Sequence, residues 1–427
     1  HAGALAGLWR REGRAAVKAA LAEVARPDPA LVPWREDVLQ RVRAARAEGR
    51  RTVLVSAADR RLAEAAAAHL GLFDEVHGSD GRRELVGAAR AALLTERFGE
   101  GGFDWLGGPD PRDAPVRAAA RRAETAAAES GAGLAPWARA VRPHQWVKNL
   151  LVFAPLLSVH RFDAAGWGAA GLVFLAFCLA ASSAYLVNDL LDLEADRAHP
   201  VKRARPFAAG EIGPAAGALG ALGLLGAALA VAGTVSALTA GVVGFYYGAT
   251  LLYSLALKRE LVIDVCVLAG LYSLRVIGGA LAVGVDLSPW ILAFSTFLFL
   301  ALAAMKRQGE LVGLGPPGPA GEGEARGRAY RAEDLPVVTM MAIAAGYTAV
   351  LVLALYIYTP EVRALYDRPM FLWGAPPLLL YWISRMVMIA HRGGMPADPL
   401  LFALKDPISL VCAGATAAAA VLAAHGI

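Results

Sequence analysis

The stretch that decides the fold is residues 184–206, which read AYLVNDLLDLEADRAHPVKRARP. It places carboxylates and an amide at the end of a long apolar run. Asn188, Asp192 and Asp196 recur at every fourth position, so one helix would present them on a single face, with Asp189 at its flank. Clustered carboxylates repel one another, and they are expensive to desolvate at a membrane boundary. A divalent cation relieves both costs, and hard oxygen ligands of this kind suit Mg²⁺.

A cationic cluster follows the carboxylates directly, and it consists of Arg197, His199, Lys202, Arg203 and Arg205. A metal ion that bridges phosphate oxygens, with Lys and Arg neutralising the remaining charge, is the arrangement that a bound diphosphate needs. The sequence therefore predicts a Mg²⁺-dependent site for a diphosphate-bearing substrate, with Lys202, Arg203 and Arg205 among its ligands. A solvated, salt-bridged helix end is the alternative interpretation.

The composition places this motif in a membrane protein. Of 427 residues, 57% are hydrophobic and 19% are charged, whereas soluble proteins carry roughly 25% charged residues. A run of about 20 apolar residues can span a bilayer. Nine candidate spans follow Trp146, at 146–160, 166–188, 214–233, 236–256, 262–284, 288–305, 336–358, 370–391 and 405–426. We expect residues 1–135 to form a small α/β domain and residues 136–427 to form an all-α polytopic domain of nine transmembrane helices.

The basic residues predict how the chain is oriented. They lie in short clusters between apolar runs, without the basic stripe and interleaved aromatics of a nucleic-acid-binding protein. We therefore expect contact with membrane lipids and none with nucleic acid. If the N-terminal domain is cytoplasmic, one face of the membrane carries Arg197, Lys202, Arg203, Arg205, Lys258, Arg259, Lys306, Arg307, Arg326, Arg328, Arg331, Arg392 and Lys405, and the other carries only Arg161, Arg363 and Arg368. The positive-inside rule then predicts an inner-membrane protein with a cytoplasmic active site, beside which the Gly-, Pro- and Glu-rich segment 311–328 forms a flexible connector or a lid.

The pattern from Asn188 to Pro206 resembles the first aspartate-rich motif of the UbiA superfamily of intramembrane prenyltransferases. The resemblance covers about 140–427. It implies a nine-helix fold whose cytoplasmic site opens into the bilayer. It also implies that Asn188, Asp189, Asp192 and Asp196 bind Mg²⁺, and that Asp192 and Asp196 are catalytic.

That superfamily carries a second acidic motif after its fourth span. Residues 253–264 lie at the corresponding place and read YSLALKRELVID, so the usual pair of aspartates is replaced by Glu260 and Asp264, one helical turn apart. Asp264 is the expected catalytic and metal-binding residue, and Tyr253 and Lys258 are expected to bind substrate. Arg275 lies further along the same apolar helix, where a charge usually faces a functional cavity. Pairing with a structural carboxylate is the alternative for Arg275.

Residues 142–149, which read RPHQWVKN, make the resemblance more specific. Together with HPVKRARP at 199–206, they look most like the decaprenyl-phosphate phosphoribosyltransferase branch. That branch implies phosphoribosyl pyrophosphate as the donor and a polyprenyl phosphate as the acceptor, with Lys148 and Asn149 near the phosphates. On the loop after the span 288–305, we expect Lys306 to complete the donor site. An aromatic or other prenyltransferase that uses a polyprenyl diphosphate is the alternative, and a non-enzymatic transporter or receptor is a third reading. A homo-oligomer stays open.

The N-terminal domain resembles the haloacid dehalogenase phosphatase fold. An apolar strand ends at Ser56, the position of that family's phosphate-binding hydroxyl. Arg90 stands where the family has lysine, and the acidic motif is degraded in the stretch 107–113, which reads GGPDPRD. The nucleophilic DxDxT motif is absent from 1–140, and the chain starts at His1 without an initiator Met. We expect either a missing first strand or a domain that is no phosphatase, and we favour an inactive domain. An active one would remove the 5-phosphate from a phosphoribosyl product.

Overall fold

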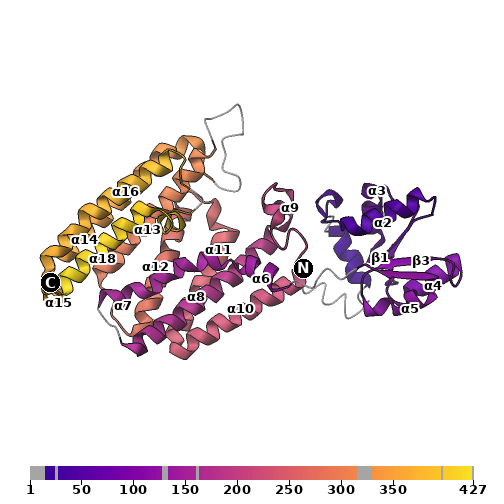
Figure 1. Cartoon of the computed structure of the whole chain (residues 1–427), viewed down its shortest axis with the longest axis horizontal. Helices are drawn as coiled ribbons and strands as arrows, with labels where there is room; N and C mark the ends of the chain where they lie inside the picture. Colours follow the sequence, from indigo (N-terminus) through magenta and orange to yellow (C-terminus); the bar gives the residue numbers. More distant parts are fainter. Residues whose placement is uncertain are drawn as a thin grey trace. The chain divides into compact units, whose positions relative to one another are not determined.

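The computed structural model describes residues 15–24, 27–126, 133–159, 163–314, 329–395 and 398–425. The chain divides into two compact units (Figure 1). The first contains His1–Arg139 together with Asp192–Pro214, and the second contains Ala140–Leu191 together with Ala215–Ile427. Most of the expected lid, residues 315–328, lies outside the described residues.

The first unit has the α/β character that the sequence predicts. Two parallel strand pairs form, β1 with β2 and β3 with β4. Asp59 caps the first crossover helix by accepting the backbone N–H of Arg61 at 3.0 Å, and Gly71 ends that helix in the left-handed conformation. The elements are α2 (Glu36–Ala47), β1 (Val53–Asp59), α3 (Arg60–Leu70), β2 (Glu75–Ser79), α4 (Ala88–Phe98), β3 (Asp104–Gly107), α5 (Ala114–Ala119), β4 (Arg122–Thr125), α9 (Leu193–Ala198) and η4 (Lys202–Ala204).

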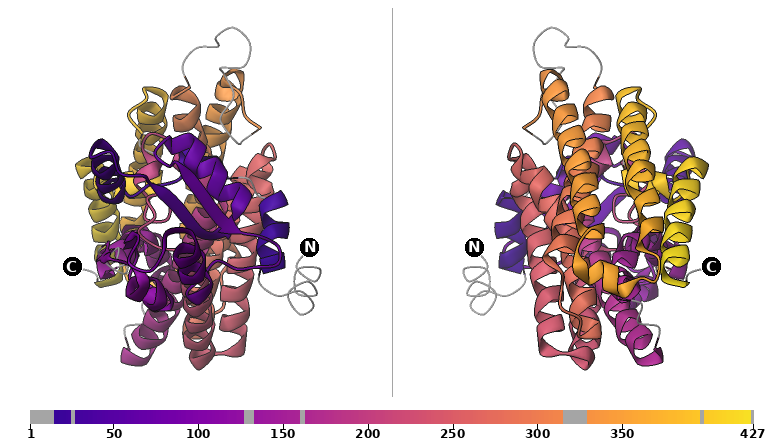
Figure 2. Two further views of the ribbon diagram at one scale, coloured as in Figure 1. Left: turned by 90° about the vertical axis from the view of Figure 1, so that its right-hand side faces the viewer. Right: turned by 90° about the vertical axis from the view of Figure 1, so that its left-hand side faces the viewer.

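The second unit is built from long apolar helices that lie side by side (Figure 1, Figure 2). The long elements are α8 (Ala164–Leu191), α10 (Pro214–Val235), α11 (Ala237–Leu255), α12 (Ile263–Val283), α13 (Pro289–Val312), α14 (Leu335–Ile357), α16 (Ala375–His391) and α18 (Pro407–His425). Within the described ranges, eight helical segments are long and apolar enough to cross a membrane. Large apolar side chains such as Leu222, Leu351 and Val411 lie exposed on them. Because such surface is stable against lipid rather than water, the protein is a multi-pass integral membrane protein.

Small residues allow these helices to approach closely. A Cβ atom added at Gly279 of α12 would lie only 2.0 Å from the carbonyl oxygen of Val152. Val152 belongs to the 3₁₀ segment η3 (Pro143–Phe153), which packs against both α8 and α12. Close backbone contact at glycine replaces the hydrophobic driving force that lipid does not supply. This contact fixes η3, and with it Lys148 and Asn149, against the helix that carries Arg275.

Three local expectations are wrong. Residues 146–160 do not form one long helix, because η3 continues only into the short helix α7 (Ala154–Ser158), where Pro155 lacks the N–H that a continuing helix requires. The motif 188–196 is not one helix either, since α8 ends at Leu191 and Asp192 is the cap of α9. Glu260 does not share a helix with Asp264, because the chain turns through a positive φ of 64° at Val262 before α12 begins.

Candidate active site

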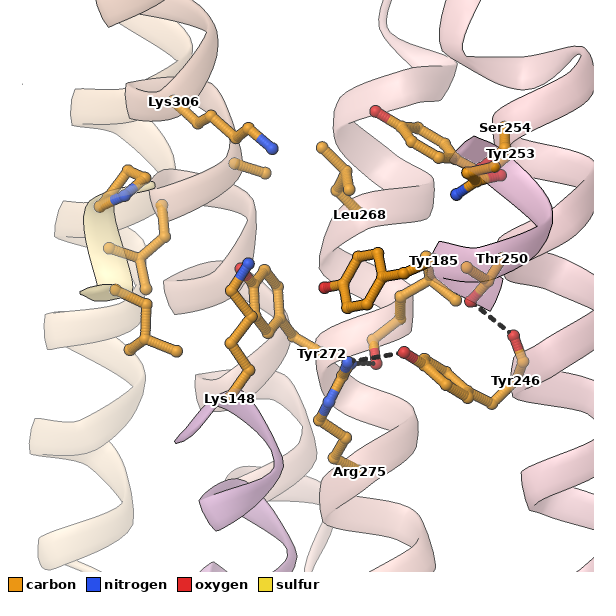
Figure 3. A pocket seen from close by; sticks show the side chains of 16 residues that line it. Lys148, Tyr185, Tyr246, Thr250, Tyr253, Ser254, Leu268, Tyr272, Arg275 and Lys306 are labelled. Atoms are coloured by element: carbon orange, nitrogen blue, oxygen red, sulfur yellow. Dashed lines mark hydrogen bonds between the residues drawn. The ribbon is translucent and has the colours of Figure 1, made fainter. Parts of the chain in front are cut away.

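A cavity of about 180 Å³, lined by both polar and apolar side chains, lies inside the second unit (Figure 3). Helices α8, α11, α12 and α13 contribute most of its walls, and η3 and α17 (Pro399–Ala403) complete it. The lining residues are Lys148, Tyr185, Asn188, Tyr246, Thr250, Tyr253, Ser254, Leu268, Leu271, Tyr272, Arg275, Leu302, Ala303, Lys306, Pro399 and Leu400. The structure thus brings together six residues that the sequence singled out: Lys148, Asn188, Tyr253, Arg275 and Lys306 line the cavity, and Asn149 bonds Arg275 behind it.

The cavity is positively charged. Lys148, Arg275 and Lys306 line it, and none of its described lining residues is acidic. Figure 3 shows Lys306 at the upper left of the cavity, with Lys148 and Arg275 extending into it from below. Asp398 offsets part of the charge of Lys148. Because charges interact more strongly in the low dielectric of a membrane protein interior than in water, the cations that line the cavity favour anionic ligands.

Arg275 is the most firmly held of these cations. Its side chain is buried within α12, where Nε donates to Asn149 Oδ1 at 2.7 Å and Nη2 donates to the Tyr246 hydroxyl at 2.8 Å. A third bond reaches the carbonyl oxygen of Leu271 (Figure 3). The guanidinium also lies 5.5 Å from the centre of the Tyr272 ring. Among the described residues, the acceptors of its hydrogen bonds are neutral, so none of them offsets the charge that Arg275 presents to the cavity.

Hydroxyl groups surround the cations, and sequence reasoning identified only Tyr253 among them. Tyr246, Thr250 and Tyr253 lie one turn apart on α11, so one face of that helix presents all three to the cavity. Tyr185 lies three residues before Asn188 on α8, and Tyr272 lies three residues before Arg275 on α12. The sequence pattern that could have identified these tyrosines is a hydroxyl residue one helical turn from an amide or a charged residue.

Asn188 offers an oxygen atom suited to a cation. Its Oδ1 atom is buried and, in the described part of the chain, makes no hydrogen bond. A buried polar atom without a partner costs about 1–3 kcal/mol, so such an atom at a cavity wall is a candidate ligand position. An amide oxygen is the kind of hard donor that Mg²⁺ accepts. Asn188 therefore fits the predicted role as a metal ligand.

The neighbouring Asp189 is held differently. It is buried and forms an ion pair with Arg142, which stands just before η3 in the left-handed conformation with φ 52°. The Arg142 guanidinium also lies 5.0 Å from the centre of the Tyr185 ring. This pair links the end of α8 to the start of η3. That Asp189 binds a metal stays a prediction.

Asp264 lies in a second buried cluster. Arg307 Nη2 is 2.6 Å from Asp264 Oδ2, and both side chains are fully buried. The Tyr330 hydroxyl donates to Asp264 Oδ1 at 2.7 Å and accepts the backbone N–H of Val262 at 3.0 Å. Burial and the bond to Asp264 raise the pKa of Tyr330, so the phenol stays a donor. Glu310 pairs with Arg307 from the other side. The catalytic and metal-binding role of Asp264 stays a prediction.

The remaining predicted residues are not among the residues that line the cavity. Asp192, Asp196, Lys202, Arg203 and Arg205 belong to the first unit, where Asp196 is buried and pairs with Arg205 at 2.6 Å. Lys258, in η5 (Leu257–Arg259), is half-buried and does not line the cavity. In the part of the chain that the structure describes, no three Asp, Glu, His or Cys side chains gather as a metal cluster. That these residues join Asn188 at one site stays a prediction.

Lys148 has a partner that the sequence did not reveal. Its ammonium group forms an ion pair with Asp398, the residue that precedes α17. Asp398 Oδ1 also accepts the backbone N–H groups of Leu400 at 3.1 Å and Leu401 at 3.2 Å. Pro399 and Leu400 line the cavity. The C-terminal part of the chain therefore contributes to the cavity wall through a helix that Asp398 caps.

Comparison with known proteins identifies the family of this chain. The sequence model of the UbiA prenyltransferase family matches residues 150–313. An uncharacterized protein, y4nM, from Sinorhizobium fredii is 34% identical over 96% of this chain and 83% of its own length. The chain belongs to the UbiA prenyltransferase family, and it is a transferase of that superfamily. Nodulation protein NoeC from Azorhizobium caulinodans is 36% identical over 65% of this chain and 89% of its own length.

Two further comparisons are more limited. The first covers less of the chain, and the second shows the fold alone. Decaprenyl-phosphate phosphoribosyltransferase from Mycolicibacterium smegmatis is 44% identical over 40% of this chain and 56% of its own length. The solved structure of a UbiA homolog from Archaeoglobus fulgidus, bound to GPP and Mg²⁺, has a TM-score of 0.51 and 17% identity, covering 66% of this chain and 99% of that one. The structural match supports the membrane fold of this UbiA protein.

The N-terminal part of this UbiA protein matches a second family, haloacid dehalogenase-like hydrolase, over residues 1–129. Arg90 Nη1 lies 2.8 Å from both carboxylate oxygens of Asp113, and both side chains are buried. Arg90 also lies 5.4 Å from the centre of the Trp105 ring. The arginine at the expected lysine position is thus engaged with a carboxylate of the degraded acidic motif. The inactivity of this domain stays a prediction.

Proposed function

We propose that this protein transfers a 5-phosphoribosyl group from phosphoribosyl pyrophosphate to a polyprenyl phosphate. The observation that carries the proposal is the cavity that Lys148, Arg275 and Lys306 line together, with Asp398 paired to Lys148 at its wall. Both substrates are phosphate-bearing anions, and neutralising the departing diphosphate is the main electrostatic demand of the reaction. A cavity of about 180 Å³ admits a phosphate-bearing head group, while a polyprenyl chain must lie outside it.

The hydroxyl groups of the cavity favour a sugar donor over an allylic one. Tyr185, Tyr246, Thr250, Tyr253 and Ser254 supply hydrogen-bonding groups that match the hydroxyls and phosphates of a phosphoribosyl group. An allylic chain carries no hydrogen-bonding groups and could not use these hydroxyls. The relatives named decaprenyl-phosphate phosphoribosyltransferase point to the same donor and acceptor class.

The reaction forms one bond and breaks one. A phosphate oxygen of the polyprenyl phosphate attacks the anomeric carbon of the donor, and the bond from that carbon to the pyrophosphate oxygen breaks. Pyrophosphate departs with the bonding electrons, so no covalent enzyme intermediate is required. Lys148, Arg275 and Lys306 stabilise the charge that develops on the leaving group, and the apolar walls formed by Leu268, Leu271 and Leu302 shield the electron-poor carbon from water.

We also propose that Mg²⁺ assists this reaction. When bound, the ion supplies Lewis-acid neutralisation of the diphosphate. The support is the buried Asn188 oxygen without a hydrogen bond in the described structure, together with the Asp192–Asp196 spacing that follows it. Asp189 and Asp264 remain proposed ligands, and each also pairs with an arginine. The solved A. fulgidus homolog carries Mg²⁺, and we extend that property to this chain.

We propose an inner-membrane location with the cavity and the N-terminal unit on the cytoplasmic side, on the evidence of the basic loops. We further propose that η3 and α7 together make a ninth crossing. A 3₁₀ helix rises about 2.0 Å per residue and an α-helix about 1.5 Å, so the two segments together reach about 30 Å, the thickness of the hydrocarbon core. With 11 and 5 residues, the two segments are together long enough to take the place of one long transmembrane helix.

The test uses the purified full chain in lipid vesicles with labelled phosphoribosyl pyrophosphate, a polyprenyl phosphate and Mg²⁺. We expect a labelled lipid product, and we expect Lys306→Met to lower its rate of formation strongly. In a parallel reaction, geranyl diphosphate competes with the donor. If geranyl diphosphate alone protects the protein against thermal unfolding and no phosphoribosyl lipid forms, the donor assignment fails and prenyl transfer takes its place.

A further inference from the structure

An ion pair joins two distant parts of the chain at the wall of the cavity. Lys148 lies in η3, and Asp398 lies just before α17, 250 residues later in the sequence. Both side chains are largely shielded, at 13% and 10% exposure. A shielded pair is screened less by salt and solvent than a surface pair, so it constrains its partners more strongly.

The carboxylate of Asp398 is itself fixed in place. Oδ1 accepts the N–H groups of Leu400 and Leu401, and the ion pair with Lys148 forms through Oδ2. One oxygen thus caps α17 while the other holds the ammonium group. Because both oxygens are engaged, Asp398 ties the position of Lys148 to the backbone of the helix whose Pro399 and Leu400 line the cavity.

A lysine side chain needs such an anchor to act as a fixed charge. It has four rotatable bonds, and placing it in one conformation costs up to about 2 kcal/mol of side-chain entropy. Its ammonium group carries three donors. One donor satisfies Asp398, so the other two stay available for phosphate oxygens. The geometry therefore allows Lys148 to hold Asp398 and an anionic ligand together, without exchanging one for the other.

We propose that Asp398 is a positioning residue, which holds the Lys148 ammonium at the cavity wall for the phosphate of an incoming substrate. This inference rests on the proposed function, in which Lys148 binds a phosphate group. Asp398 itself does not touch the substrate; it acts through Lys148. The C-terminal loop before α18 is in this way part of the substrate-binding apparatus, although its sequence carries no recognisable motif.

The first measurement needs no substrate. Reductive methylation of the purified full chain, followed by mass spectrometry, reports the reactivity of each lysine, with the exposed Lys202 as internal standard. In the wild type we expect Lys148 to react more slowly than Lys202. Asp398→Asn keeps the helix cap, because asparagine caps as well as aspartate, but it removes the charge. We expect this variant to speed the methylation of Lys148 and leave Lys202 unchanged.

The second measurement is a double-mutant cycle on the transfer reaction. Asp398→Asn should lower kcat/KM for the donor about tenfold, the factor equivalent to about 1.4 kcal/mol, and Lys148→Met should lower it at least as much. In the Lys148→Met background, Asp398→Asn should cause no further loss. Asp406→Asn is the matched control, because Asp406 caps α18 and pairs with Arg385 outside the lining of the cavity, and it should leave kcat/KM unchanged.

The outcomes separate this inference from the proposed function. Faster methylation of Lys148 without any phosphoribosyl transfer would refute the donor assignment and leave the positioning contact standing. Unchanged methylation in Asp398→Asn, or losses that add in the double variant, would overturn the positioning role and show that Asp398 serves α17 alone. Asp398→Ala removes the cap as well as the charge. The amount by which its Tm falls below that of Asp398→Asn measures how much the cap contributes to stability.

Discussion

Arg275 offers the sharpest test of how the cavity works. Arg275→Met keeps most of the side-chain volume but removes the guanidinium. Asn149 Oδ1 and the Tyr246 hydroxyl then lose partners that now lie at 2.7 and 2.8 Å. Each buried hydrogen bond to a charged group contributes about 1.5–3 kcal/mol in water-soluble proteins, but pairs inside membrane proteins average less, about 0.6 kcal/mol. We expect a stability loss of about 1–3 kcal/mol.

The loss of activity should exceed the loss of stability. Removing a preorganised cation from a site where negative charge develops typically costs about 2.7–4 kcal/mol, a factor of about 10²–10³ in rate. Arg275→Lys keeps the charge but has three donors instead of five, and it lacks the planar guanidinium that faces the Tyr272 ring. We therefore expect this variant to recover only part of the rate. Asn149→Ala serves as the control, because it disturbs the same hydrogen bond without removing the charge.

The assay measures transfer rate and thermal unfolding on the same vesicle preparations. Rates are taken well below the unfolding midpoint of each variant, so that the folded fraction is equal. If Arg275→Met transfers at the wild-type rate under these conditions, Arg275 is a structural residue and the electrostatic reasoning is refuted. If Asn149→Ala loses as much activity as Arg275→Met, the shared hydrogen bond, and not the charge, is what the reaction needs.

Three further predictions concern other parts of the chain. Asn188→Ala should raise the Mg²⁺ concentration for half-maximal activity about tenfold, equivalent to about 1.4 kcal/mol, whereas Asn188→Asp keeps an oxygen ligand and should not; equal Mg²⁺ dependence in both would contradict a metal role. The Arg385 guanidinium lowers the pKa of Asp406 from 3.8 to about 2, so the stability from this pair should be full above pH 3.8 and disappear as the pH falls through about 2; unfolding curves of Asp406→Asn should lack that step. Arg90→Met leaves the buried Asp113 without its arginine and should destabilise the N-terminal unit by about 3 kcal/mol, measured by proteolysis of that unit, and an unchanged cleavage rate would show that the pair contributes nothing.

The long spans were predictable because hydropathy alone determines them. The expected span 214–233 appears as α10 (Pro214–Val235), and 262–284 appears as α12 (Ile263–Val283). Apolar length is a local property that survives any tertiary arrangement. The segment 146–160 was not predictable in this way, because its proline at position 155 and its 3₁₀ winding change the length per residue.

The site was predictable where a residue is costly in its surroundings. Arg275 stands out because a charge in an apolar helix requires a reason, and Lys306 was expected from the polar cluster that follows the span 288–305. Tyr246 and Tyr272 did not stand out, since a tyrosine in an apolar helix usually serves packing. Asp398 could not be found at all, because an ion pair between segments 250 residues apart leaves no periodic pattern in the sequence.

Winding η3 at three residues per turn has a consequence for mutation of this segment. Trp146, Asn149 and Val152 fall in one row, from which Trp146 donates to Ser182 at 3.0 Å, Asn149 bonds Arg275, and Val152 meets Gly279. Lys148 falls outside that row, because neighbouring rows are about 120° apart in a 3₁₀ helix. Inserting one residue before Trp146 leaves the row intact. Inserting one between Trp146 and Val152 turns the residues after the insertion by about 120° relative to those before it. Natural variants of this segment should therefore change length there in steps of three or not at all.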